Sequence, residues 1–161
     1  DTSTGLKDAD VIVTVTSAVD AVIHPADLKP GAVVCDVARP RDVSVRVAKE
    51  RPDVLVIEGG IVQVPGHMVC GKTDKRGIDK DGEFNFGFPT GTAYACMSET
   101  MMLALDQRYE SFTLGKTVSV EQASTMWQLA DKHGFGLAGF RSFERAVTPE
   151  TIAAVRKAAG R

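Results

Sequence analysis

The sequence lacks a long hydrophobic run and has little cysteine. No apolar stretch approaches the roughly 20 residues that cross a bilayer, so we expect no membrane span. The first residues, DTSTGLKDAD, show no signal-peptide pattern. Three cysteines without a repeated spacing do not make a disulfide framework. Together these absences favour a cytoplasmic protein.

Neither sign of charge dominates the sequence. Lys and Arg number 19 against 21 Asp and Glu, which gives a net charge of -2. A protein that binds nucleic acid or an anionic membrane carries a strong basic excess, so we expect neither partner. Hydrophobic residues make up 43% of the 161 residues and charged residues 25%. This balance is ordinary for a globular protein, and the length suffices for a real core.

A phosphate-binding loop is also missing. No G-x-G-x-x-G follows a predicted strand, and GKTDKRG does not have the spacing of a P-loop. The chain begins at Asp1 and leads almost directly into a strand. We interpret it as a fragment or processed chain of a dinucleotide-binding domain, with the pyrophosphate site upstream, and expect it to be inactive alone. An incomplete sheet exposes a strand edge, which favours a homo-oligomer or pairing with the missing N-terminal half.

Three apolar, β-branched stretches predict strands. They cover residues 10–18, 31–40 and 54–60, and a helical pattern containing Val43 and Val47 separates the last two. Alternating strands and helices indicate a parallel sheet, and near-continuous apolar runs predict strands buried on both faces. The predicted fold class is α/β, the C-terminal half of a doubly wound, Rossmann-like parallel sheet followed by C-terminal helices.

The predicted organisation has three parts. Residues 1–63 form a partial NAD(P)-binding, Rossmann-like domain, residues 64–91 an active-site loop or lid, and residues 92–161 a helical C-terminal region. In this last part the sequence predicts helices from about Thr92 to Arg108 and from about Ser119 to His133. A third helix starts after Thr148, with proline at its first position.

Small and polar residues follow each predicted strand, where a doubly wound sheet binds its ligand. Hydroxyl groups there can bond a ribose or a carboxamide, and small side chains let a flat ring approach the backbone. Tight turns have the same composition, so both interpretations stay open. The cofactor-binding candidates are Thr16, Ser17, Ala18, Ala38, Arg39, Gly59 and Gly60.

Cys96 is the candidate nucleophile. It lies near the start of a predicted helix, where backbone N–H groups and the helix dipole favour a thiolate. Glu99 is three residues later on the same face and could relay a proton, although its bare charge would oppose a thiolate. The pattern alone favours the other interpretation, a buried and inert cysteine. We expect Cys35 in the core, Cys70 as an exposed thiol, and no metal site.

Several segments resemble a known family. VVCDVARPRDVS is similar to a strand–turn segment of glutamyl-tRNA reductases and shikimate dehydrogenase relatives. VIVTVTSAVDAVI, VLVIEGGIV and TAYACMSETMMLALDQRYESFTLGK resemble, in order and spacing, the long-chain acyl-(acyl-carrier-protein) reductases. The stretch 71–91 and the tail after Phe135 depart from that family's pattern.

The resemblance implies an enzyme that reduces a fatty acyl thioester to an aldehyde with NADPH, or with NADH. Cys96 would hold the acyl group, delivered by an acyl-carrier protein or coenzyme A, and Glu99 would be the matching acid. Two alternatives remain: a shikimate- or quinate-dehydrogenase-like oxidoreductase, and a non-catalytic nucleotide-binding fragment.

Overall fold

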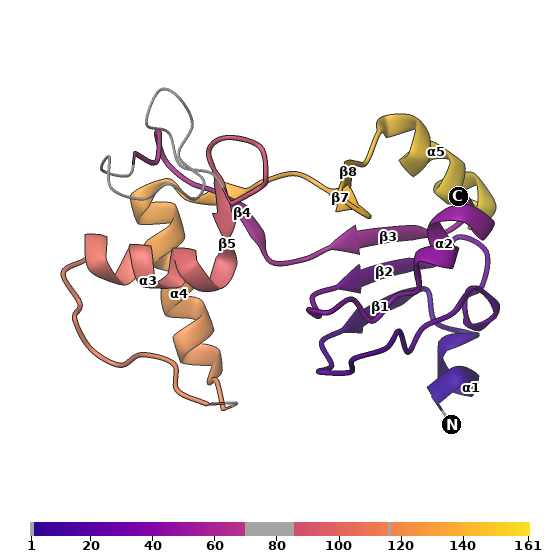
Figure 1. The fold of residues 1–161 in the computed structure, drawn as a ribbon, viewed down its shortest axis with the longest axis horizontal. Helices are drawn as coiled ribbons and strands as arrows, with labels where there is room; N and C mark the ends of the chain where they lie inside the picture. Colours follow the sequence, from indigo (N-terminus) through magenta and orange to yellow (C-terminus); the bar gives the residue numbers. More distant parts are fainter. Residues whose placement is uncertain (1, 70–85, 116) are drawn as a thin grey trace. The chain divides into compact units, whose positions relative to one another are not determined.

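The chain forms two compact units. The structure, a computed structural model, describes residues 2–69, 86–115 and 117–161 (Figure 1). Unit 1 comprises residues 1–59 and 139–161, and unit 2 comprises residues 60–138. The predicted boundaries at 63 and 91 differ from this division, because the chain leaves unit 1 after Gly59 and returns to it at Gly139.

Unit 1 is built on a three-stranded parallel sheet. Its strands, in the order β1-β2-β3, are Val11–Thr14, Val33–Asp36 and Leu55–Glu58. The register places Val13 beside Cys35 and Cys35 beside Ile57. The prediction of an α/β fold with a parallel sheet is confirmed at this level.

One face of this sheet carries the core of unit 1. Val34 and Val56 are buried there together with Val47 of the neighbouring helix α2. On the opposite face Val11 and Val13 are 68% and 65% exposed. The prediction that the strands are buried on both faces is therefore wrong for β1, because no described part of unit 1 covers these two valines.

Short helices and a hairpin complete unit 1. The helical elements are α1 (Thr2–Leu6), the 3-10 turn η1 (Pro25–Asp27), α2 (Val45–Glu50) and α5 (Pro149–Ala158). The hairpin strands are β7 (Arg141–Ser142) and β8 (Arg145–Ala146). The predicted third helix is confirmed: the Thr148 hydroxyl accepts a hydrogen bond from the Thr151 N–H at 3.3 Å, and Pro149 begins α5.

Unit 2 combines a small antiparallel sheet with two helices. The sheet has the order β5-β4-β6, with strands Thr92–Tyr94, Ile61–Gln63 and Gly136–Leu137. The helices are α3 (Ala95–Leu105) and α4 (Val120–His133). The sequence predicted a helix from about Thr92, but Thr92–Tyr94 pair with β4 as a strand, so the helix begins at Ala95.

Helix α3 packs against α4, and their contact forms the core of unit 2. Met102, Leu103 and Leu129 are buried there. The predicted ends of α4 are confirmed, with Ser119 accepting from the Gln122 N–H and Gly134 left-handed at φ 78°.

The described residues bear on the expected absence of a membrane span and on the predicted loop or lid at 64–91. Within residues 2–69, 86–115 and 117–161, no helix is long and apolar enough to cross a membrane. Much of the predicted loop or lid at 64–91, including Cys70, lies outside the described residues.

Candidate functional site

The junction between β5 and α3 fixes the position of Cys96. Tyr94 pairs with Ile61 of β4, and the Ala95 N–H donates to the Gly60 carbonyl at 2.8 Å. Strand β5 therefore runs directly into the helix, and Cys96 lies in its first turn. The side chain of Tyr94 does not cap this helix. The N–H groups of the first turn thus lack a capping side chain, and they favour negative charge.

Cys96 is exposed. This excludes the interpretation of Cys96 as a buried core residue, which the pattern of apolar neighbours had favoured. Ser98, two residues later, is buried instead. The expected core position of Cys35 holds in part, since its side chain is half-buried in β2.

Cys96 and Glu99 line two cavities of unit 2. The larger has a volume of about 700 Å³ and is bounded mainly by apolar side chains of α3 and α4. Its other lining residues include Ser98, Met102, Met126, Trp127, Phe135 and Leu137. The smaller, of about 470 Å³, is bounded by α3 and the polar segment that follows it. Cys96 therefore lies where an apolar cavity and a polar cavity meet.

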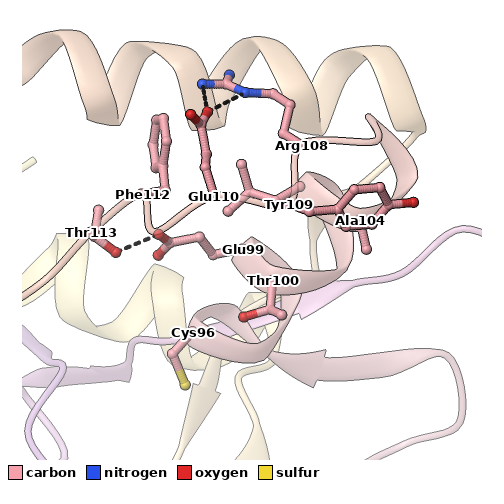
Figure 2. A pocket seen from close by; sticks show the side chains of 10 residues that line it. Cys96, Glu99, Thr100, Ala104, Arg108, Tyr109, Glu110, Phe112 and Thr113 are labelled. Atoms are coloured by element: carbon pink, nitrogen blue, oxygen red, sulfur yellow. Dashed lines mark hydrogen bonds and ion pairs between the residues drawn. The ribbon is translucent and has the colours of Figure 1, made fainter.

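Figure 2 shows the polar cavity from close by. The Thr113 hydroxyl donates to Glu99 at 2.5 Å, and Arg108 forms an ion pair with Glu110 at 2.8 Å. The sulfur of Cys96 points away from the Glu99 carboxylate. This arrangement does not place Glu99 as a direct proton acceptor for the thiol; its carboxylate instead ties α3 to the segment containing Thr113.

Sequence reasoning did not identify two residues of this region, Ser98 and Thr113. Ser98 falls between Ala95 and Met102 at helical spacing, so a polar residue interrupts an apolar face. This interruption is the sequence feature that could have identified Ser98. Thr113 lies outside any helix or strand, and its contact with Glu99 depends on how the chain folds back after α3. No local pattern marks such a contact.

In unit 1, a buried aspartate organises the end of β1. The Asp42 carboxylate accepts hydrogen bonds from the Thr14 hydroxyl, from the Thr16 hydroxyl at 2.6 Å and from the Thr16 N–H at 3.0 Å. Burial alone would raise the pKa of Asp42, but these hydrogen bonds outweigh it and hold the pKa below its usual value. The Thr16 hydroxyl also accepts from the Ala18 N–H at 3.1 Å. Two predicted cofactor contacts, Thr16 and Ala18, thus serve this internal network.

Three of the other predicted cofactor residues also have contacts inside unit 1. The Ala38 N–H donates to the Asp36 carboxylate at 3.1 Å, and Arg39 donates to the Ala38 carbonyl at 2.8 Å. A Cβ on Gly59 would lie 2.8 Å from Val37, so packing inside the unit explains the glycine. The remaining two candidates, Ser17 and Gly60, are exposed, and Gly60 belongs to unit 2.

Several donors among the predicted residues, including those of Thr16 and Ala38, have a partner inside the protein. NADPH and NADH remain predictions.

Opposite charges meet where β3 ends. Arg41 forms an ion pair with Glu58, which is buried, and another with Glu144 in the turn between β7 and β8, each at 2.9 Å. The Glu144 N–H also donates to the Glu58 carboxylate at 3.3 Å. Phe143 and Glu144 both have positive φ, 45° and 67°, so two non-glycine residues make this tight turn. The network therefore holds the hairpin onto the sheet of unit 1.

A curated protein is similar to most of this chain. No family model matches the chain. Aminotransferase PigE of Serratia sp. (strain ATCC 39006) is 32% identical to the chain over 142 residues. The aligned region is 88% of this chain but 15% of that protein, so the chain spans a small part of the relative that it matches.

This relative corrects the functional prediction. It is named an aminotransferase, whereas the sequence predicted an NADPH-dependent acyl-thioester reductase, with dehydrogenase-like and non-catalytic alternatives. The reductase and dehydrogenase predictions are overturned by this finding, and the resemblance to the acyl-(acyl-carrier-protein) reductases is not confirmed. The coarser expectation of an enzyme agrees with a relative that is itself an enzyme.

Proposed function

We propose that unit 2 accepts an acyl group from a thioester onto the sulfur of Cys96. The observation that carries this proposal is the place of an exposed thiol in the first turn of α3, where the apolar and polar cavities meet. An apolar cavity suits an acyl chain, and the thiol beside it suits the carbonyl carbon at the end of that chain. The proposed reaction class is acyl transfer, with no reduction.

The chemistry is an exchange of thioesters. The Cys96 thiolate attacks the carbonyl carbon of the incoming thioester, a new C–S bond forms, and the original C–S bond breaks. The electron pair leaves with the departing thiolate, which then takes a proton from water. The two thioesters have similar energies, so the exchange needs no external reductant or oxidant. The N–H groups that Tyr94 leaves without a side-chain cap can stabilise the negative oxygen of the tetrahedral intermediate.

The two cavities suggest how the substrate lies. We assign the acyl chain to the apolar cavity, whose walls include Met102, Met126 and Trp127. The leaving thiol, of coenzyme A or a carrier protein, is assigned to the polar cavity beside Arg108. Glu99 is a positioning residue in this proposal, because its hydrogen bond with Thr113 holds one wall of the polar cavity.

Transamination is not assigned to these residues. A transaminase holds pyridoxal phosphate on a lysine as a Schiff base. Within the described ranges no lysine is buried: Lys29 is partly exposed and pairs with Asp10 at 3.0 Å, and the others are exposed.

A Rossmann-like classification of unit 1 and a cytoplasmic location remain predictions beside this proposal.

The test is acylation of the purified protein by octanoyl-coenzyme A without any nicotinamide. Intact-mass spectrometry is expected to show the addition of one octanoyl group that hydroxylamine removes, as it does from thioesters. Cys96→Ala is expected to abolish the addition. Cys35→Ala is the matched control, since Cys35 lies in β2 of unit 1, and it is expected to acylate as the wild type does.

Two results would contradict the proposal. One is an addition that persists at the same rate in Cys96→Ala. The other is the absence of any hydroxylamine-sensitive addition in a wild-type protein whose Cys96 reacts readily with iodoacetamide.

A further inference from the structure

Ser98 is buried in the wall of the apolar cavity with an unused hydroxyl. Ser98 is 1% exposed, and its Oγ has no hydrogen-bond partner among the described residues. The residue nevertheless lines the cavity, together with Ala95 and Met102 on the same face of α3. A buried hydroxyl without a partner is costly, so native proteins rarely keep one without a role.

We infer that the Ser98 hydroxyl binds an oxygen carried on the aliphatic chain of the ligand. Most of the other lining residues are apolar, including Met102, Met126 and Phe135, and they suit the hydrocarbon part of such a chain. The cavity therefore selects an oxo- or hydroxy-substituted chain over plain hydrocarbon. The inference rests on the proposed function for the class of ligand, an acyl chain.

Ser98 lies two residues after Cys96, which on α3 is a rise of about 3 Å and a rotation of about 200°. The side chains of the two residues therefore leave the helix on nearly opposite sides, although both residues line the cavity. A free acid that is not attached to Cys96 can place an oxygen at Ser98 without passing around the helix, so the test uses free acids, with the substituent on the third carbon.

The chain supplies its own probe for binding. Trp127 is the one tryptophan of the sequence, lines the same cavity and is 70% exposed. A ligand that enters the cavity changes the surroundings of this indole, so tryptophan fluorescence reports binding. Free acids are used as probes, decanoate and 3-hydroxydecanoate, because neither can form a thioester by exchange. Titration of the Cys96→Ala protein removes any remaining contribution from the thiol.

We expect 3-hydroxydecanoate to bind about 2- to 12-fold more tightly than decanoate, as one net hydrogen bond allows. Ser98→Ala is expected to bring the two affinities together while decanoate binds as before. Ser124→Ala, on an exposed part of α4 outside the cavity lining, is the matched control and should keep the preference. Ser98→Ala removes an unpaired buried hydroxyl, so its midpoint of urea unfolding should not fall.

Three results would overturn the inference. The first is equal affinity for the two acids in the protein that retains Ser98. The others are an equal loss of affinity for both acids in Ser98→Ala, and no binding of either acid. The acylation test is read separately. If octanoyl-coenzyme A leaves Cys96 unmodified while the hydroxyl preference depends on Ser98, acyl transfer fails and the inferred ligand-binding role of Ser98 stands.

Discussion

Replacing Asp42 by asparagine tests the internal network at the end of β1. In the wild type one Asp42 oxygen accepts from the Thr14 hydroxyl and the Thr16 N–H, and the other accepts from the Thr16 hydroxyl. An asparagine keeps one acceptor oxygen but places an NH₂ group against at least one of these donors. The negative charge that strengthens all three bonds is also lost.

The magnitude follows from the number of bonds broken. At least one hydrogen bond to a charged group is lost at a fully buried site, so we expect Asp42→Asn to lower the free energy of unfolding by about 2–4 kcal/mol. The pKa of Asp42 is lowered in the folded protein. Its ionisation therefore stabilises the fold above the unfolded pKa of about 3.9, and this contribution is lost as pH falls through the lower folded value. The difference between wild type and Asp42→Asn should be full at pH 6 and shrink below about pH 4.

Two signals separate the units in a urea titration. Trp127 and both tyrosines, Tyr94 and Tyr109, lie in unit 2, so tryptophan fluorescence follows unit 2 and far-UV circular dichroism follows both units. Asp42→Asn is expected to move the circular dichroism transition to lower urea and to move the fluorescence transition less. Hydrogen exchange at the Thr16 amide should accelerate, because this N–H donates to Asp42.

The control for this experiment is Asp20→Asn, an exposed aspartate of the same unit, which should change stability little. Equal stability of Asp42→Asn and Asp20→Asn at pH 6 would refute the assigned role of the network. A stability difference that stays constant down to pH 2 would refute the assigned ionisation.

Two further changes test the packing of each unit by urea unfolding. Leu129→Ala empties a buried position of α4 and should cost about 2–5 kcal/mol in the fluorescence transition, whereas Leu105→Ala, at an exposed position, should cost far less; similar losses would contradict the assigned core. Gly31→Ala places a Cβ against the Cβ of Ala159, in a backbone with φ 78°, and should cost about 1–3 kcal/mol or more, whereas Gly5→Ala meets open space; equal effects would contradict this packing.

The sequence predicted the parallel strands and the capped helices because local chemistry determines them. β-Branched runs marked the three strands, and Ser119, Gly134 and Thr148 marked helix ends through side-chain caps and a left-handed glycine. The start of α3 was misplaced because a strand of three residues is too short to show a pattern, although Thr92 and Tyr94 both favour strands. Their conformation is set by pairing with β4, a contact that is distant in sequence.

The candidate site was predicted in part. The placement of Cys96 at a helix start followed from the sequence, but its exposure did not, since the apolar neighbours suggested a core position. At Thr16 the hydroxyl suggested a ligand contact; the structure shows that it donates to Asp42, and the ligand contact remains a prediction. Burial and hydrogen-bond partners depend on the whole fold, so a small polar residue at a strand end is compatible with either role.

The interrupted path of unit 1 has a consequence for how the protein is made. Its three parallel strands are complete by Glu58, yet β7, β8 and α5, which pack on them, come only after residue 138. On a ribosome, all of unit 2 leaves the exit tunnel before residues 139–161 of unit 1 do. Domains generally fold as units during synthesis. Unit 2 can thus fold before α5 is available to pack on the sheet of unit 1. During that interval the parts of β3 that contact β7 and α5 in the folded protein are uncovered, and an uncovered strand can pair with another chain.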